Sequence, residues 1–77
     1  MFDAINVYPN PVNTVLTVSA TESMNAIRIV DLTGKVVAEY NGNGITQEIN
    51  VEDLKAGIYT IQVVTTAGNS SKQFVKK

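Results

Sequence analysis

The sequence predicts an all-β domain, an immunoglobulin-like antiparallel β-sandwich of about seven short strands. Apolar residues recur with period two, and β-branched residues dominate the apolar segments, as in strands that place one face on a core. Turn-forming segments separate these strands at spacings of roughly 8 to 12 residues. The pattern lacks the helices that a βαβ arrangement would need, so two packed antiparallel sheets are favoured.

The first two predicted strands occupy residues 5–8 and 15–19. Pro9 and Pro11 end the first of them, because proline lacks the amide donor that a central strand needs. We therefore expect this segment to be a sheet edge or a kink that crosses from one sheet to the other.

A tight hairpin is expected between a third strand at 27–30 and a fourth strand at 35–40. In the turn between them, the Asp31 side chain can bond nearby backbone, and Gly34 supplies the positive φ that the reversal requires. This turn is the one that the sequence indicates most clearly.

A loop of Asn and Gly at 41–44 leads to the fifth predicted strand. Its alternate residues should share one face: Ile45, Gln47, Ile49 and Val51. Residues 51–56 can form at most one helical turn, because Gly57 and the strand-forming residues after it break a helix. We expect a short 3₁₀ turn there.

The sixth predicted strand, at 58–65, is apolar on both faces and is therefore expected to lie centrally in its sheet. A turn at 66–70 leads to the seventh strand at 71–75, in which Phe74 should point inward.

Residues 54–63 resemble the tyrosine corner of immunoglobulin-like sandwiches. In that motif the Tyr59 hydroxyl would bond backbone a few residues upstream. The alternative is that Tyr59 is a core aromatic residue with its hydroxyl at the rim. Either role is structural.

The composition argues against catalysis, metal binding and nucleic-acid binding. The 77 residues include no His, Cys or Trp, so the commonest general base, the commonest transition-metal ligand and a thiol nucleophile are missing. We predict no enzyme activity, no cofactor and no metal site. The 6 Lys+Arg nearly balance the 7 Asp+Glu, and no basic run is interleaved with aromatic residues. No apolar run approaches the roughly 20 residues of a membrane-spanning helix.

The remaining polar and aromatic candidates have simpler interpretations. Glu52 and Asp53 are adjacent in a turn, where such acids usually cap backbone amides. Residues 69–71 match a glycosylation acceptor pattern, which we interpret as an ordinary polar turn. Tyr8 or Tyr40 could form a single aromatic platform for a sugar.

Four segments carry a family resemblance: YPNP at 8–11, IVDLTGKVV at 29–37, LKAGIYTIQV at 54–63 and KQFVKK at 72–77. Their order, spacing and position at the end of the chain resemble the type A C-terminal sorting domain of the type IX secretion system. The similarity extends from about residue 5 to residue 77. Each motif alone occurs widely, so the combination is what makes the resemblance specific.

The resemblance implies that residues 5–77 are a sorting domain for a larger cargo upstream in the same chain. Residues 1–4 would be a linker or a remnant of recombinant expression. In a Gram-negative bacterium the cargo would reach the periplasm, and the outer-membrane secretion machinery would recognise the folded domain. A surface sortase would then remove it. The recognition candidates are Pro9, Pro11, Gly34, Lys35, Gly57, Tyr59, Lys72, Phe74, Val75, Lys76 and Lys77.

Residues 71–77 are expected to be the docking element, because a terminal strand offers free backbone groups. Lys72, Lys76 and Lys77 would add a cationic cluster. The alternative is that these lysines only prevent edge-to-edge aggregation.

The sequence leaves the role of the prolines, the class of function and the oligomeric state open. Pro9 and Pro11 are either recognition features or structural residues that fix the entry to the first sheet. The rival function is a generic immunoglobulin-like adhesion or carbohydrate-binding module, because this fold hosts many functions. Open sheet edges could also pair two copies into a dimer.

Overall fold

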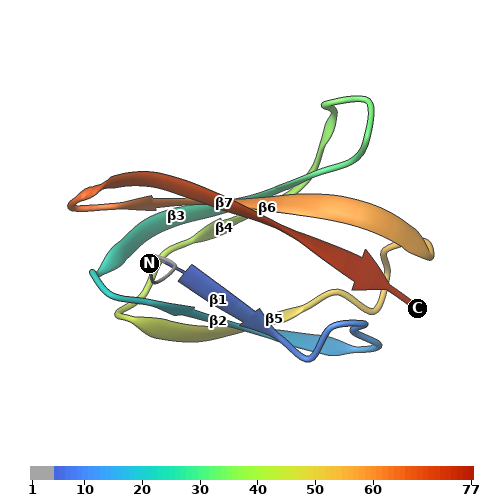
Figure 1. The fold of residues 1–77 in the computed structure, drawn as a ribbon, viewed down its shortest axis with the longest axis horizontal. Helices are drawn as coiled ribbons and strands as arrows, with labels where there is room; N and C mark the ends of the chain where they lie inside the picture. The colour runs from blue at the N-terminus through green and yellow to red at the C-terminus, as the bar shows by residue number, and fades with distance from the viewer. Residues whose placement is uncertain (1–4) are drawn as a thin grey trace.

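The computed structural model describes residues 5–77, and the predicted linker at residues 1–4 lies outside them. Within this range, seven strands form two facing sheets (Figure 1). The strands are β1 (Ile5–Tyr8), β2 (Val15–Ala20), β3 (Met24–Val30), β4 (Val36–Asn41), β5 (Thr46–Asn50), β6 (Gly57–Thr65) and β7 (Gly68–Lys76). The predicted all-β sandwich is confirmed.

One sheet has the strand order β1-β2-β5 and the other β4-β3-β6-β7, with antiparallel pairing between neighbours. In a constant-type immunoglobulin domain the fourth strand joins the sheet of the first, second and fifth. Here β4 pairs with β3 instead, because the tight turn between them keeps the chain in one sheet.

The core lies between the two sheets and is built from alternate residues of the strands. Leu16 of β2, Ile61 of β6 and Phe74 of β7 are among its fully buried side chains. Burial alternates strictly along β2 from Val15 to Ala20, as period-two patterning requires. Aliphatic burial on both inner faces therefore holds the sandwich together in the absence of any cysteine.

The predictions for the first strand are both confirmed. β1 is the edge of its sheet, and the residues after it cross to the other sheet. Val12 makes a parallel bridge with Lys76, near the end of β7. The peptide bonds before Pro9 and Pro11 are both cis.

The predicted turn between β3 and β4 is confirmed in detail. One Asp31 carboxylate oxygen accepts hydrogen bonds from the Thr33 N–H at 2.9 Å and the Lys35 N–H at 3.0 Å. The Gly34 N–H donates to the Asp31 carbonyl at 3.0 Å, and Gly34 has φ of 88°. A single carboxylate thus organises the reversal.

The Asp31 turn should lose its support in acid. The Thr33 hydroxyl, followed by the backbone N–H groups of Lys35 and Thr33, lowers the pKa of Asp31 below its ordinary 3.8. A carboxyl whose folded-state pKa is lowered contributes stability above its unfolded pKa and loses it as pH falls through the folded value. We expect the melting temperature of Asp31→Ala to fall less than that of the parent chain below pH about 4. Parallel melting curves at each pH would contradict this.

The fifth strand differs partly from its prediction. Ile49 and Val51 are buried, but Ile45 is 55% exposed and precedes β5. Ile45 already lies beside β2, because its carbonyl accepts the Ala20 N–H at 2.7 Å next to the Ser19–Thr46 pair, but its side chain is not buried in the core. Residues 51–56 form a single turn closed by the Leu54 N–H and the Val51 carbonyl at 3.0 Å, without continuing into a helix.

β6 lies between β3 and β7, which confirms its predicted central position. Its outward face is nevertheless open to solvent, since Ile58 and Val64 are 45% and 40% exposed. In the part of the chain that the structure describes, no helix has the length and apolar character to cross a membrane.

Candidate functional site

Segments from all four sequence motifs lie at the same end of the sandwich, on the right of Figure 1, where the turn between β3 and β4 projects away from the others. They are residues 9–12, the turn at 31–35, the turn and strand start at 51–57, and residues 75–77. We call this region the motif end. The opposite end carries the loops between β2 and β3, β4 and β5, and β6 and β7.

At the motif end, residues 10–12 lie along the outer edge of β7. The Val75 N–H donates to Oδ1 of Asn10 at 2.9 Å, and the Val75 carbonyl accepts the Val12 N–H at 2.8 Å. The Lys77 N–H donates to the Val12 carbonyl at 2.9 Å. These bonds join the segment after the first strand to the last residues of the sequence.

The predicted docking element at 71–77 therefore needs correction. Its last residues do not offer free backbone groups, because residues 10–12 occupy one side and β6 the other. Local strand patterning could not reveal this, since the bridging partner lies more than sixty residues away in the sequence. What this end can present to a partner is side chains.

The predicted tyrosine corner is confirmed. The Tyr59 hydroxyl donates to the Lys55 carbonyl at 2.6 Å, four residues upstream. The Tyr59 ring is 8% exposed and stacks on Phe74 of β7, with 5.7 Å between ring centroids. Gly57 begins β6 just before it, opposite Lys76. Tyr59 and Phe74 thus stabilise the fold and are not available to a partner.

The three predicted cationic residues do not form one exposed cluster. Lys72, Phe74 and Lys76 alternate on the inward face of β7. Lys76 is only 7% exposed, and its Nζ donates to the Lys77 carbonyl at 3.0 Å. Inward-pointing charge on an edge strand is a known device against edge-to-edge pairing. This geometry supports the aggregation-blocking interpretation for Lys72 and Lys76, while Lys77 is exposed.

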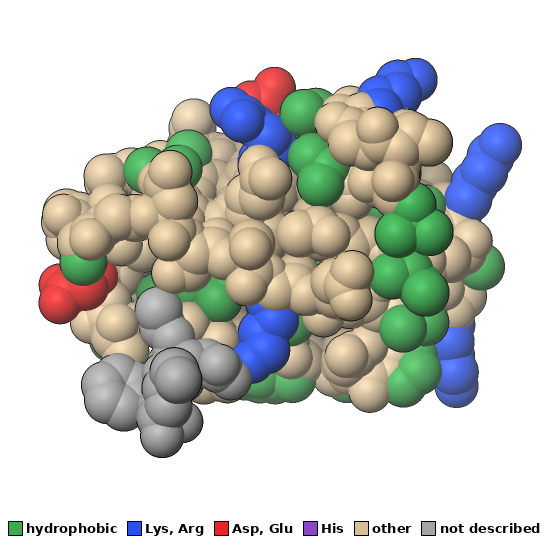
Figure 2. Space-filling model, turned by 45° about the horizontal axis from the view of Figure 1, so that its top comes forward, with side chains coloured by type: hydrophobic (Ala, Val, Ile, Leu, Met, Phe, Trp, Pro, Cys, Tyr) green, Lys and Arg blue, Asp and Glu red, His purple; other side chains and the backbone are tan. Residues whose placement is uncertain are grey.

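Leu32 in the Asp31 turn is an exposed apolar residue of the motif end, and two further apolar side chains there form a pair on the outer face of the sheet. Ile58 of β6 and Val75 of β7 are directly paired across the strands and are 45% and 39% exposed. Pro9 and Pro11 are exposed nearby on the chain that bonds to Val75. Figure 2 shows hydrophobic side chains gathered along this margin of the four-stranded sheet, bordered by Lys or Arg side chains.

Ile58 was missed as a candidate by sequence reasoning, although a signal was present. Tyr59 points inward, so strand alternation places Ile58 outward, where an isoleucine has no structural need to be. Gly34 and Lys35 are exposed at the same end, in the Asp31 turn. Of the predicted recognition residues, the motif end therefore exposes Pro9, Pro11, Gly34, Lys35, Gly57, Val75 and Lys77.

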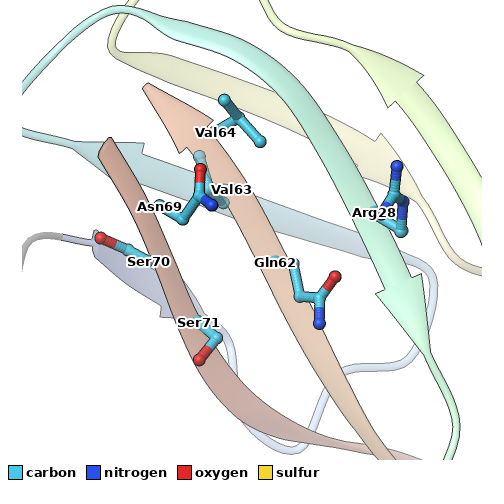
Figure 3. Close-up of a pocket in the computed structure, with 7 residues that line it drawn as sticks. All are labelled: Arg28, Gln62, Val63, Val64, Asn69, Ser70 and Ser71. Carbon is cyan, nitrogen blue, oxygen red and sulfur yellow. The ribbon is translucent and has the colours of Figure 1, made fainter. Parts of the chain in front are cut away.

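A shallow hollow of about 260 Å³ lies elsewhere, on the outer face of the four-stranded sheet (Figure 3). Its lining is mostly polar: Arg28, Gln62, Val63, Val64, Asn69, Ser70 and Ser71. None of these is aromatic, and the hollow is below the roughly 300 Å³ at which small-molecule pockets usually begin. Nε of Arg28 also lies 3.5 Å from Oε2 of Glu39, and the two side chains form an exposed ion pair.

Tyr40 has a structural use. Its hydroxyl donates to the Asn50 carbonyl at 3.2 Å, which links β4 to β5 across the sandwich. Burial, with the charge of Asp53 as a second cause, raises the pKa of Tyr40 above its ordinary value. Tyr8 is 50% exposed. Among residues 5–77, no three acidic side chains gather in a way that could hold a metal ion.

Comparison with known proteins gives a family match over residues 6–77. The family is described as the secretion system C-terminal sorting domain. The chain is also 34% identical over 71 residues to a protein named beta-agarase D from Zobellia galactanivorans. That alignment covers 92% of this chain and 14% of the relative, so the chain spans about one seventh of the relative's length.

Proposed function

This chain belongs to the secretion system C-terminal sorting domain family. We propose that residues 5–77 are a folded export signal for a cargo protein in the same chain. Residues 1–4 would be part of the linker to that cargo. This signal directs the cargo through the type IX machinery to the cell surface or the medium. A surface sortase then removes the domain.

The observation that carries this proposal is the family match over almost the whole described chain. Membership indicates a non-catalytic tail, because the family is described by sorting and not by a reaction. The 14% coverage of the agarase relative supports a cargo that is a separate, larger unit. The rival adhesion or carbohydrate-binding function has no comparable support, since the hollow on the outer sheet lacks an aromatic platform.

We further propose that the machinery recognises the motif end. A sorting domain that is attached to unrelated cargos must be recognised through its own surface, because the cargos share none. The outward pair Ile58 and Val75 exposes apolar area that the core does not use. Apolar side chains at the centre of an interface usually carry most of its binding energy. Pro9, Pro11 and Lys77 would form the rim.

This surface exists only in the folded domain. Residues 10–12 and 75–77 are distant in sequence and are held together by the bonds of Val12 and Val75. The recognition and structural interpretations of Pro9 and Pro11 are therefore compatible, because the same segment both crosses the sheets and borders the apolar pair. A partner would therefore bind a surface that forms only when the domain folds, and not a continuous sequence motif.

The dimer through open sheet edges stays a prediction. Residues 10–12 cover the end of β7, and Lys72 and Lys76 point inward along it. Inward charge opposes strand addition at that edge. The other edge strands of the two sheets are β1, β4 and β5.

Fusion to a reporter tests the proposed function. We expect a reporter with a periplasmic signal peptide to leave a type IX-competent cell only when residues 5–77 follow it. Matched controls are the reporter alone and the same fusion in a strain without the type IX translocon. Equal amounts of reporter outside the cell with and without residues 5–77 would refute the proposal.

A further inference from the structure

Two consecutive Asn-Gly dipeptides lie between the end of β4 and the start of β5: Asn41-Gly42, which begins with the last residue of β4, and Asn43-Gly44 in the loop. An Asn-Gly pair is chemically labile, because glycine has no side chain to keep its amide nitrogen away from the preceding asparagine side chain. The two dipeptides are identical in sequence. Any difference in their reactivity must therefore come from the fold.

Gly42 is held in place by β3. Its N–H donates to the Asn25 carbonyl at 2.9 Å. A Cβ on Gly42 would lie 2.2 Å from the Met24 carbonyl oxygen, so its backbone is packed directly against that strand. The Asn41 carbonyl also accepts Nε2 of Gln47 at 3.0 Å. The nitrogen of Gly42 cannot turn toward the Asn41 side chain without breaking this packing.

In the described part of the chain, Gly44, unlike Gly42, lacks both the N–H hydrogen bond and the close packing. Within residues 5–77 its N–H has no hydrogen-bond acceptor. A Cβ on Gly44 would meet nothing within 4 Å, and Asn43 is exposed. Among residues 5–77, no hydrogen bond of the Gly44 N–H and no atom packed around its Cα has to give way when this nitrogen approaches the Asn43 side chain.

We propose that Asn43 is a site of spontaneous deamidation and that Asn41 is protected by the fold. The Gly44 nitrogen attacks Cγ of Asn43, gives up its proton and forms a five-membered succinimide, and the side-chain amide leaves as ammonia. Solvent water then opens the ring. Cleavage of the bond from Cγ to the Gly44 nitrogen gives aspartate, and cleavage at the Asn43 main-chain carbonyl gives isoaspartate.

The two products should affect the domain differently. The Gly44 carbonyl accepts the Met24 N–H at 2.9 Å, and the adjacent Ile45 carbonyl accepts the Ala20 N–H at 2.7 Å. Isoaspartate inserts a methylene into the main chain directly before these bonds, whereas aspartate leaves the backbone unchanged. Isoaspartate should therefore weaken the connection between the sheets, and aspartate should only add a charge.

Peptide mapping of the intact folded chain after incubation in mildly alkaline buffer tests the proposal. Mass spectrometry locates the exchange of NH₂ for OH, and backbone fragmentation separates aspartate from isoaspartate. We expect Asn43 to react at least about tenfold faster than Asn41, which corresponds to a local opening free energy of about 1.4 kcal/mol at Gly42. In denaturant the two asparagines should react at similar rates.

Two variants serve as matched controls. Asn43→Gln should remove the fast reaction, and Asn41→Gln should leave it unchanged. Equal rates at the two sites in the folded chain would overturn the proposal. So would a faster reaction at Asn41, or an inert Asn43 under conditions in which the denatured chain reacts.

Discussion

Replacing Phe74 with alanine should remove a large part of the stability of the domain. Phe74 is 1% exposed and stacks on Tyr59, which anchors the corner before β6. A buried Phe→Ala change costs about 3–5 kcal/mol, while a domain of this length has roughly 4–12 kcal/mol of total stability at 0.05–0.15 kcal/mol per residue. We expect the midpoint of urea unfolding to fall sharply or the cooperative transition to disappear.

The conservative change Phe74→Leu is the control for this prediction. It retains most of the buried volume and should cost less than about 1.5 kcal/mol beyond the lost ring stacking. Cooperative unfolding of Phe74→Ala within about 1 kcal/mol of the parent chain would show that the aromatic pair is not central to the core.

The position of Phe74 also decides how recognition by the last strand must be tested. Deleting residues 73–77 would remove Phe74, the inward Lys76 and the bonds from Val75 and Lys77 to residues 10–12. The truncated chain would fail to export because it fails to fold. Substitutions that keep the core intact are therefore needed to separate recognition from folding.

Strand positions were predictable because period-two burial depends on near neighbours only. β2 and β6 follow the alternation that their side chains indicate, whereas β3 follows it from Ile27 to Ile29 and departs from it at its register shifts. The Asp31 turn was equally local, since its hydrogen bonds span at most four residues. The tyrosine corner was also contained in one short segment, from Lys55 to Tyr59.

The features that were missed have different causes. The pairing of Val12 with Lys76 has no signature in either local sequence, so the closed edge of β7 was not predicted. Ile45 was placed on the buried face of β5 by alternation, but β5 begins at Thr46 and the Ile45 side chain is exposed. Lys76 lies on the same inward face of β7 as Phe74, so alternation alone would have predicted that it is buried. It was expected to be exposed because it is charged.

The double substitution Ile58→Thr and Val75→Thr should abolish most export while the domain remains folded. Both side chains point outward and are 45% and 39% exposed, so the core loses little. Threonine keeps the β-branched shape that strands favour, and surface changes usually stay within about 0.5 kcal/mol. If the pair is the centre of the recognised surface, its loss should weaken the binding free energy to the machinery by about 2 kcal/mol or more. The amount of exported reporter should then fall at least about tenfold.

Val64→Thr provides the matched control, because Val64 is a β6 residue with 40% exposure. It pairs with Asn69 near the opposite end of the sheet, so it has similar exposure without belonging to the motif end. Export should be unchanged in this variant, and urea unfolding should show that all variants retain their fold. Equal loss of export in both variants would place recognition along the whole outer face. Full export of the double variant, with its fold intact, would exclude the apolar pair from recognition. The Asp31 turn, the prolines, Gly57 and Lys77 would then be the remaining exposed candidates of the motif end.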